Sequence, residues 1–110
     1  MVIVLIRRCV KADKEAEFLK SYRAQKPTHV DFIDETLTKL RDDQSLPPEM
    51  RNLELGCEEG CATYINVARW CCAESFQENF RDQLQRYDPN VECSPRLRAV
   101  LTVVNPQMGF

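Results

Sequence analysis

Cysteine is the residue type in this sequence with the widest chemistry, since thiols form disulfides and bind zinc. The six cysteines are Cys9, Cys57, Cys61, Cys71, Cys72 and Cys93. Cys57 and Cys61 can supply half of a zinc site, which Cys71 or Cys93 would complete. The irregular spacing and the distant single histidine count against zinc, and a cysteine is most often a small buried hydrophobe. Because the N-terminal apolar run is too short for a signal peptide, we expect reduced thiols and a cytoplasmic protein.

A second candidate site lies in the segment 63–70, where residue types alternate as in a strand. The alternation places Tyr64, Asn66 and Trp70 on one face, with Asn66 and Trp70 about 13 Å apart at their backbones. A pocket between them can hold an aromatic molecule, because the amide binds a carbonyl or phenol and the indole stacks and donates a hydrogen bond. A buried Asn without a partner costs about 1 to 3 kcal/mol, so a ligand, a water or a backbone group must meet it. Trp70 fits an ordinary core position equally well.

The elements that position these residues follow the order strand, helix, strand, strand, helix, strand. We expect them at residues 2–9, 13–26, 30–40, 63–70, 73–86 and 97–104. This order predicts an α+β, ferredoxin-like βαββαβ fold, in which an antiparallel four-stranded sheet carries both helices on one face. The length suits a single domain over 1–110. The segment 41–60 is rich in loop residues and is either a lid or rim or a solvated surface loop.

The first and fourth strands are apolar in both alternating phases, which predicts that both of their sides are covered. Two helices can cover only one face of the sheet. A bare second face would expose a larger apolar patch than monomers tolerate, so we expect a homodimer packed sheet to sheet, as in a dimeric α/β barrel.

Charge and hydropathy exclude two classes of partner. The net charge is -2 and no basic block is longer than Arg7-Arg8, so we expect no nucleic acid. No apolar run approaches the roughly 18 residues that a membrane-spanning helix needs, so we expect no membrane.

The string Asn66-Val-Ala-Arg-Trp70-Cys-Cys-Ala-Glu74-Ser-Phe76, together with the element order, resembles the antibiotic biosynthesis monooxygenase family of the dimeric α/β-barrel superfamily. Cys72 stands where that family usually has a serine. In the branch that oxidises aromatic polyketides without a cofactor, an Asn and a Trp at the spacing of Asn66 and Trp70 line the pocket. The resemblance implies a cofactor-independent monooxygenase that uses O₂ on a small aromatic or quinone-like substrate.

Such a reaction needs side chains that assist deprotonation and stabilise the substrate anion. Tyr87 and His29 are the further catalytic candidates beside Asn66 and Trp70, although His29 also fits a solvated turn. The substrate-binding candidates are Tyr64, Phe76, Phe80 and Tyr22. Residues 73–86 hold no histidine for haem iron and the glycines form no nucleotide fingerprint, so we expect no cofactor and no metal.

Two other functional hypotheses stay open. The fold hosts unrelated functions, so a non-catalytic dimeric domain that binds a ligand is the first alternative. A thiol or zinc-binding protein is the second.

Overall fold

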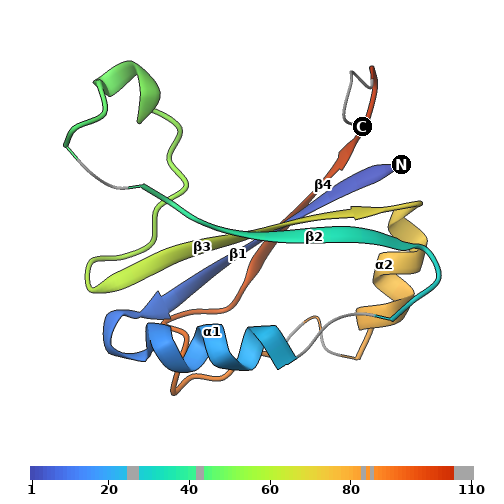
Figure 1. The fold of residues 1–110 in the computed structure, drawn as a ribbon, viewed down its shortest axis with the longest axis horizontal. Coiled ribbons are helices and arrows are strands. Elements are labelled where there is room, and N and C mark those ends of the chain that lie inside the picture. Colours follow the sequence, from blue (N-terminus) through green and yellow to red (C-terminus); the bar gives the residue numbers. More distant parts are fainter. Residues whose placement is uncertain (25–27, 42–43, 83, 85, 106–110) are drawn as a thin grey trace.

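The computed structural model describes residues 1–24, 28–41, 44–82, 84 and 86–105 (Figure 1). Its main elements are β1 (Val2–Lys11), α1 (Glu15–Ala24), β2 (Phe32–Lys39), β3 (Cys61–Trp70), α2 (Ala73–Phe80) and β4 (Leu97–Thr102). Two short 3-10 helices, Ala12–Lys14 and Pro48–Met50, precede α1 and interrupt the segment between β2 and β3. The predicted order of elements is confirmed.

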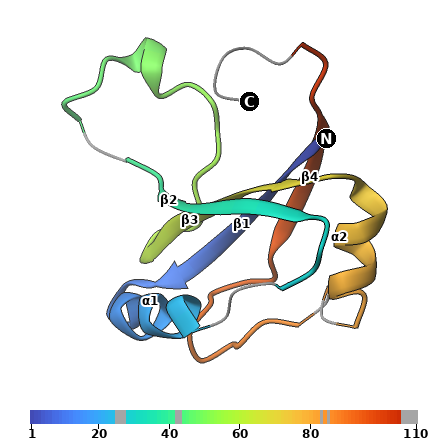
Figure 2. The same cartoon turned by 45° about the vertical axis from the view of Figure 1, so that its right-hand side comes forward.

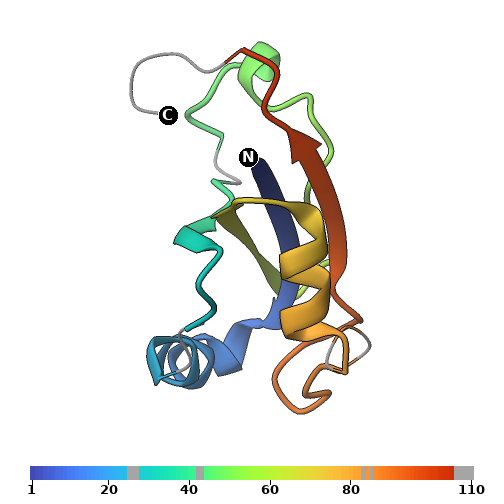
Figure 3. The ribbon, with the colours of Figure 1, turned by 90° about the vertical axis from the view of Figure 1, so that its right-hand side faces the viewer.

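The four strands form one antiparallel sheet in the order β2-β3-β1-β4. Both helices lie on the same side of this sheet, as Figures 1 and 2 show. The described chain therefore has two layers, the sheet and the pair of helices, and Figure 3 shows it at right angles to the view of Figure 1. This arrangement confirms the ferredoxin-like α+β fold.

The strand register assigns each side chain to one of two faces. The inner face, which meets the helices, carries Val4 and Ile6 of β1 beside Ala68 and Asn66 of β3. The outer face carries the alternate residues, among them Ile3, Leu5, Val67 and Leu101. On the inner face, one row across the sheet runs Leu37, Asn66, Ile6, Arg98. Asn66 therefore lies in the middle of the sheet and not at its edge.

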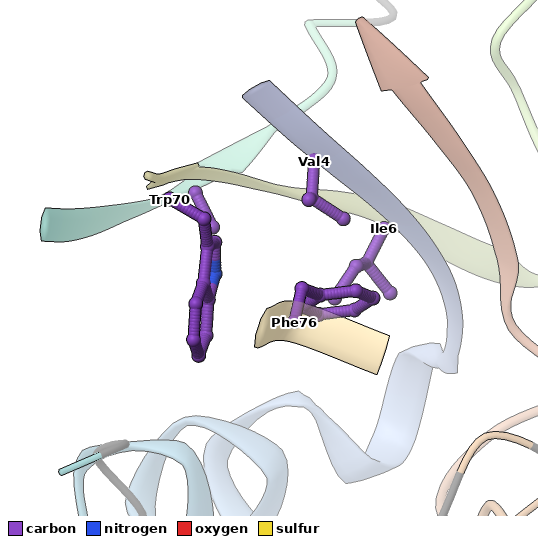
Figure 4. Close-up of a cluster of buried hydrophobic side chains, with 5 residues drawn as sticks. Val4, Ile6, Trp70 and Phe76 are labelled. Atoms are coloured by element: carbon purple, nitrogen blue, oxygen red, sulfur yellow. The ribbon is translucent and has the colours of Figure 1, made fainter. Parts of the chain in front are cut away.

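Two apolar clusters join the helices to the inner face. The first contains Val4, Ile6, Ala68, Trp70 and Phe76, and Figure 4 shows Phe76 of α2 beneath the two β1 side chains. The second contains Val10, Phe18 and Tyr64, so it attaches α1 near the opposite end of β1. Because each helix fills a different end of the sheet, Asn66 lies between the two clusters.

Helix α2 ends at Phe80, although the apolar spacing predicted a helix to residue 86. The described residues Arg81, Asp82 and Leu84 form turns, and positions 83 and 85 lie outside the described residues. Leu84 nevertheless packs on the first cluster. The apolar spacing thus predicted the contact of Leu84 with the core correctly. The non-helical backbone after Phe80 places Leu84 against the core, so no further helix is needed.

The sulfur atoms of four cysteines form two disulfides, Cys9–Cys57 and Cys61–Cys93. The prediction of six reduced thiols is wrong for these four residues. The register places Cys9 of β1 and Cys61 of β3 on the outer face near the same end of the sheet, where each is bonded to a cysteine from outside these two strands. Disulfides persist in oxidising environments, so these two bridges count against the expected cytoplasmic location. Cys71 and Cys72 are free.

The outer face is only partly covered within one chain. Arg7 on that face donates a 3.5 Å hydrogen bond to the Gly56 carbonyl, so the end of the 41–60 segment crosses the sheet there. Towards the β4 edge the cover stops, and Leu97 and Leu101 are 55% and 45% exposed. The expectation that β4 is covered on both sides does not hold for a single chain. None of the described helices is long and apolar enough to cross a membrane.

Candidate functional site

Asn66 is fully buried in the inner face, at 0% exposure. Neither its amide nitrogen nor its amide oxygen has a hydrogen-bond partner among the described residues. Its neighbours in the row, Ile6 and Leu37, are apolar and cannot supply one. Buried polar groups are nearly always hydrogen-bonded, so this amide marks a place where a ligand or a water is needed.

Tyr22 of α1 brings a hydroxyl towards this amide. It donates a 2.7 Å hydrogen bond to Oε2 of Glu35 on β2. Burial, and then this hydrogen bond, raise the pKa of Tyr22 to about 12, whereas the nearby Asn66 amide acts in the opposite direction. Asn66 is thus close enough to influence the phenol, yet the two groups do not meet the distance and angle of a normal hydrogen bond. At neutral pH, Tyr22 is protonated and donates its single proton to Glu35, so its oxygen is a potential acceptor beside the Asn66 amide.

Arg8 of β1 lies on the same face, opposite Tyr64 in the register. Its guanidinium carbon is 5.6 Å from the ring centre of Phe18 and 5.9 Å from that of Tyr22. Its Nε is buried without a hydrogen-bond partner among the described residues. Burial, and then the neighbouring charge of Arg96, lower the pKa of Arg8 to about 10. A cation is therefore held over two aromatic rings in a poorly solvated place.

A buried ion pair lies on the other side of Arg8. Glu92 is 3% exposed and accepts hydrogen bonds of 3.0 and 2.9 Å from Nε and Nη2 of Arg96. The backbone of this segment pairs with the end of β1, where Val10 faces Glu92. The adjacent Cys93 is tied to β3 by its disulfide. The bridge therefore fixes the segment that carries the ion pair.

Trp70 occupies the interior of the first cluster, at 1% exposure (Figure 4). Its ring centre lies 5.4 to 6.1 Å from those of four neighbours, His29, Phe32, Phe76 and Phe80. These contacts suit a packing residue. The predicted candidates His29, Phe76 and Phe80 are thus gathered around Trp70, and Nδ1 of His29 accepts a 3.0 Å hydrogen bond from the Asp31 N–H.

Among the described residues, the contacts of Tyr64 and Tyr87 do not include the Asn66 amide. Tyr64 donates a 2.7 Å hydrogen bond to Oε1 of Glu15, and burial, followed by this bond, raises its pKa to about 12. Lys39 holds the same carboxylate oxygen at 2.8 Å. Tyr87 is half-buried between α2 and β4, and within the described part of the chain no hydrogen bond or ring contact joins it to the other candidates. Their roles stay predictions.

Sequence reasoning missed Arg8 and Glu35 as members of this site. For Arg8 a signal was present, because it interrupts the otherwise apolar phase Val2, Val4, Ile6, Val10 of the first strand. A charged residue in that phase must enter the layer between sheet and helices. Glu35 gave no such signal, since its partner Tyr22 comes from another element.

Three of the proposed zinc ligands are engaged in disulfides, whereas Cys71 is free. Cys57 is bonded to Cys9, and Cys61 is bonded to Cys93. Ligand atoms of Glu58, Cys61 and Cys93 lie within 4.8 Å of one another, but two of them are the joined sulfurs. Zinc binds thiolates, so the oxidised chain does not offer the predicted shell.

A groove of about 1080 Å³ lies elsewhere, between the 41–60 segment and the adjoining ends of β2 and β3. Its lining includes Arg51, Leu53, Glu54 and Thr63, and neither Asn66 nor Trp70 contributes to it. Figure 1 shows this segment standing away from the sheet. Because the groove lacks the buried unsatisfied groups found at Asn66, we place the candidate site at Asn66.

Comparison with known proteins supports the fold. No family model and no curated protein sequence matches the chain. Among solved structures, that of a presumed antibiotic biosynthesis monooxygenase from Bacillus cereus is similar, with a TM-score of 0.56 and 15% identity. The match covers 99% of this chain and 96% of that chain. At this identity, the chain shares the fold of that protein.

Proposed function

We propose that this chain binds a small aromatic or quinone-like molecule at Asn66, on the inner face of the sheet, and oxidises it with O₂ without a cofactor. The observation that carries the proposal is the fully buried Asn66 amide, of which neither polar atom has a partner within the described residues. An amide in this state costs about 1 to 3 kcal/mol, and a bound carbonyl or phenol oxygen would recover that cost.

The neighbouring groups suit the first step of such a reaction. An electron-rich methylene or phenol must lose a proton before O₂ can accept its electrons, and the Glu35 carboxylate beside Tyr22 is positioned to take one. Asn66 and Arg8 would stabilise the resulting oxyanion. The substrate anion and O₂ then form a C–O bond, and the peroxide loses water. The balance is R₂CH₂ + O₂ giving R₂C=O + H₂O, with all four electrons supplied by the substrate.

Oxygen uptake with Asn66→Leu tests the proposal. The wild-type protein should accelerate O₂ uptake by anthrone or 1,8-dihydroxyanthrone, which both carry the required methylene, above the buffer rate, and the variant should lose at least nine-tenths of this acceleration. Since leucine removes an unsatisfied amide, the variant should unfold no more easily than the wild type. Asn52→Leu, at an exposed position of the 41–60 segment, is the matched control. Equal uptake by both variants would refute the role of Asn66.

A non-catalytic ligand-binding domain is the second candidate, and the enclosure of Trp70 by four rings favours it. In that case the molecule would bind at Asn66 without reaching the indole. The same compounds should then bind with no O₂ uptake above the buffer rate. Binding and uptake measured on one protein sample separate the two functions.

The proposal includes a homodimer formed through the outer face. The accessible surface of the chain is 7953 Å², against roughly 6,300 Å² for a compact monomer of this mass. The excess is larger than the roughly 800 Å² that each partner buries in a standard interface. The half-exposed Leu97 and Leu101 belong to the apolar outer face. A second copy is the occupant whose surface matches by symmetry.

A further inference from the structure

The inner face carries more positive than negative charge around Arg8 and Arg98. Among the described residues, the ionised side chains that act on these two arginines are Arg96, Glu92 and Glu35. Three arginines thus face two glutamates. Lys39 and Glu15 form a separate pair at 2.8 Å and leave this balance unchanged. The cluster has a surplus of one positive charge.

Neither carboxylate is hydrogen-bonded to Arg8. Both oxygens of Glu92 bind Arg96, and Glu35 accepts the hydrogen bond of Tyr22. Within the described residues, Nη1 of Arg98 donates a 2.9 Å hydrogen bond to the Leu84 carbonyl, and this acceptor carries no charge. In the described part of the chain, the buried Nε atoms of Arg8 and Arg98 have no acceptor. Buried charges are normally paired, so an acceptor with negative charge would complete the cluster.

Asn66 joins these groups into one site. It is paired with Ile6 in the register, and Arg98 is paired with Ile6 from the other side. Arg8, two residues beyond Ile6, is the next residue of β1 on the same face. The unpartnered amide N–H₂ of Asn66 is a second buried donor for the same ligand. The rings of Phe18 and Tyr22, over which the guanidinium lies, provide flat apolar walls.

We infer that the ligand of this site is an aromatic monoanion, whose carboxylate or phenolate oxygen binds Arg8 and Asn66. This inference rests on the proposed site at Asn66, and it is independent of oxidation by O₂. One negative charge balances the surplus, whereas a dianion would exceed it. The planar guanidinium can hold a carboxylate through two parallel hydrogen bonds, and a phenolate through one.

Calorimetric titration with matched anionic and neutral aromatic probes tests the inference. The first pair is 2-naphthoate and 2-naphthamide at neutral pH. The second pair is 4-nitrophenolate and 4-nitroanisole at pH 8.5, which separates a phenolate from a carboxylate. A hydrogen-bonded charge contributes about 1.5 to 3 kcal/mol. The anion that the site recognises should therefore bind about tenfold to 100-fold more tightly than its neutral counterpart.

Arg8→Met should remove this preference, and Arg8→Lys should keep part of it, because lysine retains the charge without the planar fork. Arg7→Met is the matched control, since Arg7 is the next residue and lies on the outer face. It should leave all four affinities within about twofold of the wild type.

The outcomes distinguish the two proposals. If no anion binds better than its neutral counterpart, or if Arg7→Met weakens binding as much as Arg8→Met, the anion inference is wrong. Neutral probes that bind and lose affinity in Asn66→Leu would still support a ligand site at Asn66. An Arg8-dependent preference for an anion without any O₂ uptake would support the inference and exclude the oxidation.

Discussion

Removal of each disulfide should lower the free energy of unfolding by an amount that depends on the length of the loop it closes. The Cys9–Cys57 bridge closes a loop with a sequence separation of 48, and the Cys61–Cys93 bridge one of 32. The loops follow each other along the chain and do not overlap. The chain-entropy relation then gives losses of about 4.1 and about 3.7 kcal/mol for Cys9→Ala/Cys57→Ala and Cys61→Ala/Cys93→Ala. For 110 residues, either loss corresponds to a fall in Tm of roughly 16 °C.

Urea unfolding followed by far-ultraviolet circular dichroism measures these free energies. The double variants are compared with Cys71→Ser, whose free thiol is exposed and whose free energy of unfolding should change by less than about 0.5 kcal/mol. Because the loops are separate, the quadruple variant should lose nearly the sum of the two effects, or fail to fold. Titration of accessible thiols in denaturant without reductant should find only Cys71 and Cys72.

Several results would refute this reasoning. Six reactive thiols in the protein purified from an oxidising compartment would contradict both bridges. Losses below about 1 kcal/mol for both double variants would show that the bridges do not constrain the unfolded chain as the loop lengths require. A larger loss for Cys61→Ala/Cys93→Ala than for Cys9→Ala/Cys57→Ala would point to native contacts, such as the Glu92 and Arg96 pair beside Cys93, as the main contribution.

The remaining predictions concern pH and assembly. Because the folded state raises the pKa of Tyr22 to about 12 from 10.0, the unfolded chain loses this proton first, and the contribution of Tyr22 to stability should fall as the pH rises from 10 to 12. Tyr22→Phe should make this fall less steep in urea unfolding, and an unchanged slope would contradict the buried phenol. In sedimentation equilibrium the wild type should have twice the 12.8 kDa chain mass. Leu101→Glu on the outer face should yield monomers, whereas Val30→Glu, at a 90% exposed position, should not; a monomeric wild type would contradict the dimer.

The order of elements could be predicted because each signal is local. Alternation in Thr63–Trp70 fixed the faces of β3, and burial of Tyr64, Asn66 and Trp70 on the inner face agrees with it. The same method failed where a contact depends on distant residues. It extended α2 past Phe80, since Leu84 keeps the apolar spacing while the backbone has already turned.

The disulfides could not be predicted from spacing, because Cys57 and Cys61 look like a pair and belong to different bridges. Their partners are determined by the register of β1 with β3 and by the segment before β4 that runs along β1. Prediction of the candidate site has the same limit, because contacts between distant segments leave no pattern in the sequence. Asn66 was predictable from its place in an apolar strand face, but the Tyr22 and Glu35 contact joins α1 to β2 and has no signature in either segment.

For the proposed homodimer, the position of the bridges also predicts where a second copy binds. Cys9 and Cys61 point to the outer face at the end of β1, and the chain near Cys57 and Gly56 covers that end. A partner is therefore restricted to the other end, around Ile3 and its neighbour Leu101 across the β1 and β4 pair. Reduction would release the covering segment and enlarge the apolar area on the outer face. We therefore expect oxidation to favour one defined interface of the proposed homodimer, because it removes a competing apolar surface from the same face.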